Sequence, residues 1–143
     1  MIEKFDNKAI YLDTAPLIYY LEENPAYFSV LKTLFQKNEN GDFTFYTSSI
    51  TLTEILTLPF KLGNKKIIEQ YEHYLLKAPS INLINVNPSI AKLAAKFRSE
   101  YGFKLPDAVH VATAMEVRVD YFLTNDLELD RVKGLKVITL TNV

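Results

Sequence analysis

LPDAVHVATAMEVRVDYFLTND, residues 105–126, combines an apolar helix, a short strand and an acidic residue near each end in one continuous stretch. Pro106 suits the first turn of a helix, and the residues after it are apolar on nearly every side, which indicates a buried helix. Residues 121–124 have the aromatic and β-branched content of a strand. A buried helix that leads directly into a strand favours an α/β fold.

Short strands alternate with helices along the rest of the chain as well. Strands are also predicted at residues 9–13, 43–47, 81–86 and 136–140, with helical periodicity in the intervening stretches. This alternation is typical of a mostly parallel α/β sheet. Because the sequence contains no internal repeat, low-complexity tract or linker, we expect a single domain over residues 1–143.

The composition narrows the class of protein. The 143 residues, 48% of them hydrophobic, suffice for a packed core, and the absence of cysteine excludes disulfide frameworks and thiolate zinc sites. No apolar run has the length of a signal peptide or a membrane span, so we expect a cytoplasmic protein that does not contact membranes. The net charge of −1 argues against a simple nucleic-acid-coating module, but less against a metal nuclease with an acidic site.

Four acidic residues stand just after predicted strands or at the beginnings of predicted helices: Asp13, Glu54, Asp107 and Asp126. In open parallel sheets, the carboxyl ends of the strands line the crevice in which ligands bind. Each acid also has a purely structural interpretation, because Asp13 and Asp126 suit helix N-caps, Thr51 and Glu54 match a capping box, and Asp107 suits the positive end of a helix.

The joint pattern favours a metal site over four separate caps. Carboxylates gathered at one end of one sheet repel each other and raise each other's pKa values, and divalent cations relieve that repulsion. Mg²⁺ and Mn²⁺ prefer carboxylate and water oxygens, and the sequence has no set of histidines or cysteines with zinc spacing. We therefore predict that one or two Mg²⁺ or Mn²⁺ ions bind there.

These residues carry a resemblance to the PIN-domain family, in particular to the VapC-type toxin ribonucleases of toxin–antitoxin pairs. The matching segments, in the family's order, are Asp13-Thr14, the Thr51-x-x-Glu54 step, residues 105–114 and residues 122–126. The match extends from about residue 9 to residue 140, and the segment around Asp107 is its most specific part. Ala15 departs from the family, whose members often carry a small polar residue there.

The resemblance implies a three-layer α/β/α sandwich around a five-stranded parallel sheet. It also implies metal-dependent endoribonuclease activity with Asp13, Glu54, Asp107 and Asp126 as catalytic metal ligands, direct or through water. Thr124 matches the family's hydroxyl position beside the last acid, and Thr14 is a possible auxiliary of the same kind, although both hydroxyls also suit turns or caps. His110, one turn beyond Asp107, is expected to be a hydrogen-bonded structural residue rather than an acid or base.

Partners follow from the same resemblance: an RNA substrate, a protein antitoxin and a second copy of the chain in a homodimer. Residues 52–76 carry more apolar side chains than two surface helices need, so we expect an antitoxin groove there. The basic clusters at residues 61–66 and 96–104 could contact RNA phosphates, and the aromatic residues at 19–28 could stack on bases, although solvated charges and core packing explain them as well.

Three alternatives remain open. A strand-end aspartate also occurs in aspartyl-phosphate phosphatases and receiver domains, but Ala15 replaces the second aspartate of the phosphatases, and the acidic pair of a receiver domain is absent. A PIN-like fold can serve as a non-catalytic binding module, which loss of one of the four acids would favour. A nuclease of this family can also act in RNA processing or DNA metabolism.

Overall fold

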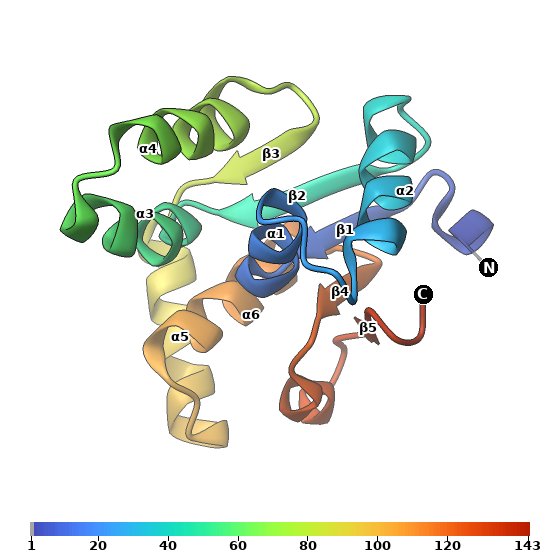
Figure 1. Ribbon diagram of the computed structural model, residues 1–143. Helices are drawn as coiled ribbons and strands as arrows, with labels where there is room; N and C mark the ends of the chain where they lie inside the picture. The colour runs from blue at the N-terminus through green and yellow to red at the C-terminus, as the bar shows by residue number, and fades with distance from the viewer. Residues whose placement is uncertain (1) are drawn as a thin grey trace.

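Residues 2–143, described by a computed structural model, contain one five-stranded sheet in which every pairing is parallel (Figure 1). The strand order is β3-β2-β1-β4-β5, so the first strand of the chain lies in the middle of the sheet. All five predicted strands are present, most of them one or two residues shorter than expected. Their bounds are β1 (Ala9–Leu12), β2 (Thr44–Ser48), β3 (Ile81–Ile84), β4 (Tyr121–Thr124) and β5 (Val137–Thr139).

Helices connect the strands, and none of those in residues 2–143 is long and apolar enough to cross a membrane. The α-helices are α1 (Thr14–Leu21), α2 (Phe28–Glu39), α3 (Ile50–Leu62), α4 (Lys65–Glu72), α5 (Pro88–Tyr101) and α6 (Leu105–Val117). Shorter turns are the 3₁₀ segments η1 (Ile2–Phe5) and η3 (Leu127–Arg131) and one π-helical turn, η2 (His73–Lys77).

Local signals explain where several helices begin and end. The side chain of Asn87 accepts a hydrogen bond from the backbone N–H of Ile90 and starts α5, with Pro88 in its first turn. Pro59 lies inside α3, which continues to Gly63. Gly63 ends the helix with a φ of 64°, a left-handed conformation that a residue without Cβ adopts at little cost.

The alternation of side chains along the strands divides the core into two layers. Ile10 and Leu12 on β1 pack with buried residues of α1 to α4 on one face of the sheet. Tyr11, between them, packs on the other face with buried residues of α5 and α6, and Phe122 on β4 stacks against it with ring centroids 4.9 Å apart. The chain is therefore a three-layer α/β/α sandwich, as the resemblance implied.

The strand order places a topological switch point at the centre of the sheet. From β1 the chain proceeds outward through β2 and β3 to one edge, and β4 then returns to the other side of β1, where Leu12 pairs with Leu123. In open α/β sheets, ligands bind at the carboxyl ends of the strands beside such a point. Asp13 follows β1 directly, and Asp126 follows β4 by two residues.

Candidate active site

Asp13 is held tightly between the two central strands. Its backbone N–H donates to the carbonyl of Leu123 at 3.0 Å, and only 8% of the residue is exposed. Its Oδ1 accepts a 2.8 Å hydrogen bond from the backbone N–H of Thr14, and its Oδ2 accepts a 2.6 Å hydrogen bond from the hydroxyl of Thr124. Asp13 is thus the N-cap of α1, as its structural interpretation predicted, and its carboxylate is also oriented by the neighbouring strand.

Thr124 connects Asp13 to Asp126. Its Oγ1 donates to Asp13 and accepts from the backbone N–H of Asp126 at 3.0 Å. Asp126 is the N-cap of η3, and its Oδ1 accepts from the N–H of Glu128 at 3.0 Å. The structure therefore brings these two predicted acids and the predicted auxiliary hydroxyl into one hydrogen-bonded arrangement.

Glu54 does not form the capping box that its sequence context suggested. The N-cap of α3 is Ser49, which makes no side-chain cap hydrogen bond. Glu54 Oε1 instead lies 2.6 Å from Nε2 of His110 and accepts a 2.8 Å hydrogen bond from the hydroxyl of Thr14. Burial alone would raise the pKa of Glu54, but the hydrogen bond and the electrostatic interaction with His110, together with the hydrogen bond of Thr14, hold the pKa below its ordinary value.

Asp107 lies in the first turn of α6, where the helix dipole favours a negative charge. Its pKa is nevertheless raised, first by burial and then by the charges of Asp13, Asp126 and Glu54, while His110 acts in the opposite direction. Asp13, Glu54 and Asp126 thus all lie near enough to Asp107 to disfavour its charged form.

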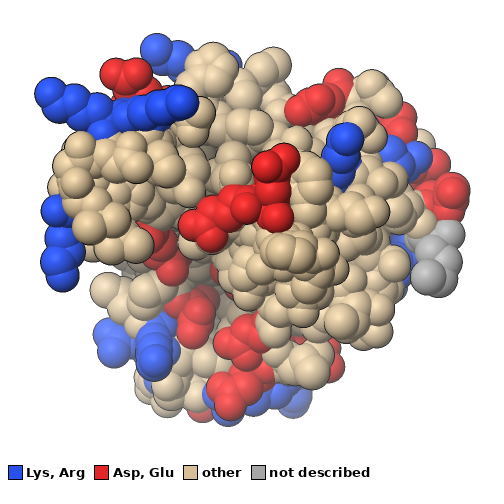
Figure 2. Space-filling model, viewed as in Figure 1, with Lys and Arg blue, Asp and Glu red and all other residues tan. Residues whose placement is uncertain are grey.

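The basic side chain nearest the acids is His110, whose Nε2 lies 2.6 Å from Glu54 and 3.7 Å from Asp13. Among residues 2–143, the ion pairs of lysine and arginine involve other carboxylates. Figure 2 shows acidic side chains across the middle of this face, with most Lys and Arg side chains nearer its rim. In the same part of the chain, no three Asp, Glu or His side chains form a ready-made metal cluster. The site is therefore an open, mutually repelling group of acids rather than a closed coordination shell.

The contacts of His110, a further functional candidate, could not be predicted from the sequence. It is 1% exposed, and its Nδ1 lies 2.6 Å from the hydroxyl of Tyr11. Tyr11 precedes Asp13 by two residues, so both side chains point to the face that α6 covers. The i+3 spacing of His110 from Asp107 was a signal that it faces the site. Its pairing with Glu54 depends on how α3 and α6 pack, which local sequence does not encode.

Two buried threonines extend this group and were missed. The hydroxyl of Thr51 lies 3.0 Å from that of Thr14 and 3.1 Å from that of Thr47, which donates to the carbonyl of Leu12. Both threonines are fully buried. Thr51 was considered only as part of the capping box. In the structure it supports Thr14, one of the two residues hydrogen-bonded to Glu54.

Three other acids that lie close to Asp126 in the sequence are exposed. Asp120, at the start of β4, accepts from the backbone N–H of Ala9 at 2.8 Å and is exposed at the opposite end of the strand from Asp126. Glu128 and Asp130 are exposed on η3. The aromatic residues 19–28 pack mainly on one another and on the core: Tyr20 stacks on Phe35 with ring centroids 3.9 Å apart.

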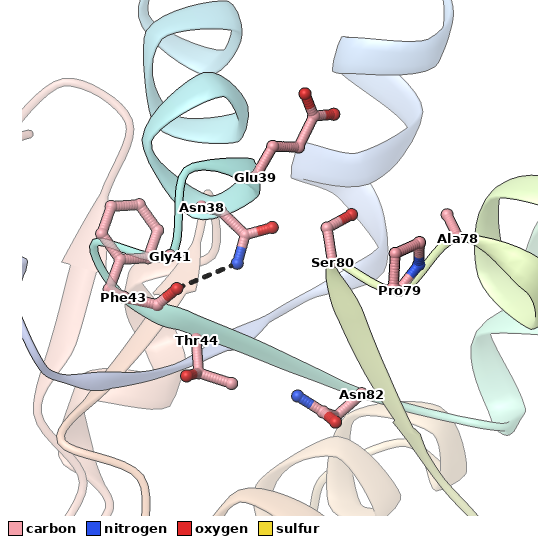
Figure 3. Close-up of a pocket in the computed structure, with 9 residues that line it drawn as sticks. All are labelled: Asn38, Glu39, Gly41, Phe43, Thr44, Ala78, Pro79, Ser80 and Asn82. Carbon is pink, nitrogen blue, oxygen red and sulfur yellow. Dashed lines mark hydrogen bonds between the residues drawn. The ribbon is translucent and has the colours of Figure 1, made fainter.

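Two cavities differ in their position relative to the four acids. A mainly apolar groove of about 210 Å³ lies between α1, α3 and α4. Most of its lining comes from the segment that we expected to receive a partner. Its walls include Ile55, Leu58, Leu62 and Tyr71, and the acidic residues Glu22 and Glu54 also line it. A larger hollow of about 590 Å³ lies beside the amino ends of β2 and β3, next to the end of α2 (Figure 3). There the amide nitrogen of Asn38 donates to the carbonyl of Phe43 at 3.1 Å.

Comparisons with known proteins agree on one family and one fold. The family model of the PIN domain matches residues 10–135. A toxin–antitoxin complex from Klebsiella pneumoniae contains a chain 24% identical to this one, with a TM-score of 0.66, covering 94% of this chain and 99% of that one. DNA-bound VapBC from Salmonella typhimurium gives 19% identity and a TM-score of 0.74, covering 93% and 98% of the two chains. No curated protein matches the chain.

Proposed function

Because the chain belongs to the PIN-domain family, we propose that it is a metal-dependent endoribonuclease and the toxin of a toxin–antitoxin pair. PIN domains are generally nucleases that use divalent metal ions. The observation that carries the proposal is the convergence of four acids on one edge of the sheet, where three of them raise the pKa of Asp107. Carboxylates crowded in this way disfavour each other's charged forms, and a bound divalent cation relieves that repulsion.

The donor set fits Mg²⁺ or Mn²⁺. All four acids offer carboxylate oxygens, the ligands these hard cations prefer, and both nitrogens of His110 are occupied by hydrogen-bond partners. Mg²⁺ usually keeps several waters and needs only one or two carboxylates, so an open group of acids suits it better than a closed shell. A bound cation of this kind lowers the pKa of a coordinated water and offsets charge on the phosphate.

The acids and the threonines of the site have different proposed roles. Asp13, Glu54, Asp107 and Asp126 would hold the cation, directly or through water. Thr124 fixes the rotamer of Asp13 through its 2.6 Å hydrogen bond, and Thr14 does the same for Glu54 at 2.8 Å. Side chains held in this way spend little of their time in unproductive orientations. The scissile phosphate of RNA would then approach the carboxyl edge of β1 and β4.

The groove between α1, α3 and α4 supports the antitoxin as a partner. It is apolar along most of its length, and Glu22 and Glu54 add negative charge. A helical or extended segment with apolar side chains and a nearby positive charge would complement it. Because Glu54 belongs to both the groove and the group of acids, a segment bound there would also restrict access to the active site. The structural neighbours are toxin–antitoxin complexes, which agrees with this assignment.

Two further expectations belong to this proposal. A homodimer is expected from the family, and light scattering of the purified chain measures its mass directly. Cytoplasmic action is expected because the proposed substrate is RNA.

An RNA cleavage assay tests the proposal. Purified protein is incubated with single-stranded and hairpin RNA in Mg²⁺ or Mn²⁺, and Asp13→Asn and Asp107→Asn are compared with Asp120→Asn. Asp120 lies at the other end of β4, so its variant is a matched control that should cleave like the wild type. We expect both site variants to lose cleavage and EDTA to abolish the wild-type activity. Full activity in either site variant, or in EDTA, would rule out the proposed site.

Other outcomes of the same assay separate the alternatives. Cleavage of DNA but not of RNA would place the protein in DNA metabolism. RNA cleavage without growth arrest on expression would favour RNA processing over a toxin. A folded protein that neither cleaves nucleic acid nor binds Mn²⁺ would be a non-catalytic binding module.

A further inference from the structure

We propose that His110 is a positioning residue that holds the Glu54 carboxylate in its place among the four acids. Tyr11 fixes the tautomer of the ring, so that the nitrogen next to Glu54 carries the proton. The inference rests on the proposed function, because it assigns His110 a task in the metal site of the nuclease. It goes beyond the sequence-based expectation of a structural histidine by stating which atom His110 controls.

The contacts of His110 connect the core to the site. On the core side, Nδ1 lies 2.6 Å from the hydroxyl of the fully buried Tyr11. On the site side, Nε2 lies 2.6 Å from Oε1 of Glu54, 3.1 Å from the hydroxyl of Thr14 and 3.7 Å from Oδ1 of Asp13. The ring itself is 1% exposed. His110 is therefore a rigid connection between the packed interior and a carboxylate whose side chain remains 30% exposed.

Hydrogen-bond chemistry decides the direction of this connection. An ionised carboxylate only accepts hydrogen bonds, so Nε2 must carry the proton that faces Glu54. In the neutral ring, Nδ1 is then an acceptor, and the hydroxyl of Tyr11 is its donor. A phenolic hydroxyl can donate as well as accept, so Tyr11 can supply this proton across the 2.6 Å contact. Tyr11 thus fixes the tautomer, and the tautomer directs one N–H to Glu54.

Glu54 is the acid whose orientation depends directly on His110. Asp13 is fixed by Thr14 and Thr124, and Asp126 by its own cap contacts. Glu54 has one more rotatable bond than aspartate and projects from α3, across the site from β1. Both hydrogen bonds that residues 2–143 donate to its carboxylate reach Oε1, which leaves Oε2 without a protein donor. Partners of this kind around metal ligands commonly change metal affinity 10- to 100-fold when they are removed.

Binding of Mn²⁺ to the RNA-free protein tests the inference with a readout other than activity. Isothermal titration is carried out on wild type, His110→Leu, His110→Gln, Tyr11→Phe and Glu54→Gln. We expect His110→Leu to weaken Mn²⁺ binding about 10- to 100-fold. His110→Gln, whose amide offers a donor to Glu54 and an acceptor to Tyr11, should recover most of the loss. Tyr11→Phe should weaken binding by a smaller factor, because it frees the tautomer without removing the ring.

A double variant distinguishes positioning from general packing. If His110 acts through Glu54, adding His110→Leu to Glu54→Gln should cause no further loss of Mn²⁺ affinity. A full additional loss in the double variant would overturn the inference, as would wild-type affinity in His110→Leu. If His110→Leu does not fold, as judged by circular dichroism, Tyr11→Phe carries the test, and unchanged affinity in that variant is the contrary result.

The outcome separates the two proposals. If the wild type binds Mn²⁺ and cleaves RNA while His110→Leu binds Mn²⁺ equally well, the nuclease stands and the role of His110 fails. If the wild type neither binds Mn²⁺ nor cleaves RNA, both proposals fail together.

Discussion

The hydroxyl of Thr124 donates a 2.6 Å hydrogen bond to Oδ2 of Asp13, which joins the ends of the neighbouring strands β4 and β1. The hydroxyl oxygen of Thr124 also accepts a 3.0 Å hydrogen bond from the backbone N–H of Asp126. One buried hydroxyl therefore orients one acid and anchors the loop that carries another.

Thr124→Val keeps the shape of the side chain but removes both hydrogen bonds. Because it leaves a buried acceptor and a buried N–H without partners, we expect a loss of about 1–3 kcal/mol in the free energy of unfolding, measured by urea denaturation. RNA cleavage should fall as well. Thr139→Val on β5, which breaks only the 3.0 Å contact with Thr141, is the control and should retain cleavage. Equal loss of activity in both variants would contradict the role given to Thr124.

Asp107→Asn should stabilise the metal-free protein while abolishing cleavage. The pKa of Asp107 is raised in the folded state, so folding disfavours its charged form, and its protonated form becomes favourable as the pH falls through the folded pKa. A neutral amide removes this penalty at pH 7, and we expect a melting temperature about 1–4 °C higher. The difference should shrink near pH 4, roughly where carboxyl groups titrate. A lower melting temperature at pH 7 would show that Asp107 is a structural cap.

Mn²⁺ should raise the melting temperature of the wild-type protein. A ligand that binds only the native state at about 100 times its dissociation constant adds roughly 2.7 kcal/mol to stability. We expect the rise to disappear in Asp13→Asn and to persist in Asp120→Asn. Differential scanning fluorimetry with and without EDTA measures it. An equal rise in all three proteins would indicate binding of Mn²⁺ elsewhere on the surface.

Arg131 stabilises the loop after Asp126 against the linker that precedes Asp107. Its guanidinium lies over the rings of Tyr101 and Phe103, 5.7 and 5.0 Å from their centroids, and its Nη2 donates to the carbonyl of Tyr101 at 2.9 Å. Lysine cannot reproduce the planar fork, so Arg131→Lys should lower the free energy of unfolding by about 1–2 kcal/mol. The control is Lys133→Met, a change at an exposed position two residues further on. Equal stabilities for the two variants would show that this contact contributes little.

Leu62→Glu should prevent antitoxin binding without unfolding the protein. Leu62 is 70% exposed and lines the apolar groove, so a charge there costs the free chain little but opposes an apolar partner. The matched control is Leu76→Glu, at a leucine 55% exposed outside the groove. Co-purification with the product of the neighbouring gene, and the rescue of growth by it, are the measurements. Retained binding in Leu62→Glu would place the partner elsewhere.

The sequence predicted the strands and the fold class well because those depend on local composition and alternation. Residues 121–124 were assigned without error, since aromatic and β-branched residues there stand between turn signals. Helical periodicity between the second and third strands did not reveal that α4 ends at Glu72 and that a π-helical turn follows it.

The site was predictable to a different degree. The strand-end acids were found because parallel strands place their carboxyl ends together. The partner of Glu54 was not, because the capping box and the contact with His110 are both compatible with the local sequence. Glu54 and His110 are 56 residues apart in the chain, and only the packing of α3 and α6 brings them into contact.

The central position of β1 has a consequence for biosynthesis. Asp13 is synthesised well before its partner Thr124, which lies 111 residues later, on the strand that completes the centre of the sheet. A nascent chain that has not yet produced β4 has no assembled group of acids, however well its first three strands have folded. Under the proposed ribonuclease function, this order of assembly would delay the cleavage of RNA until β4 has been synthesised.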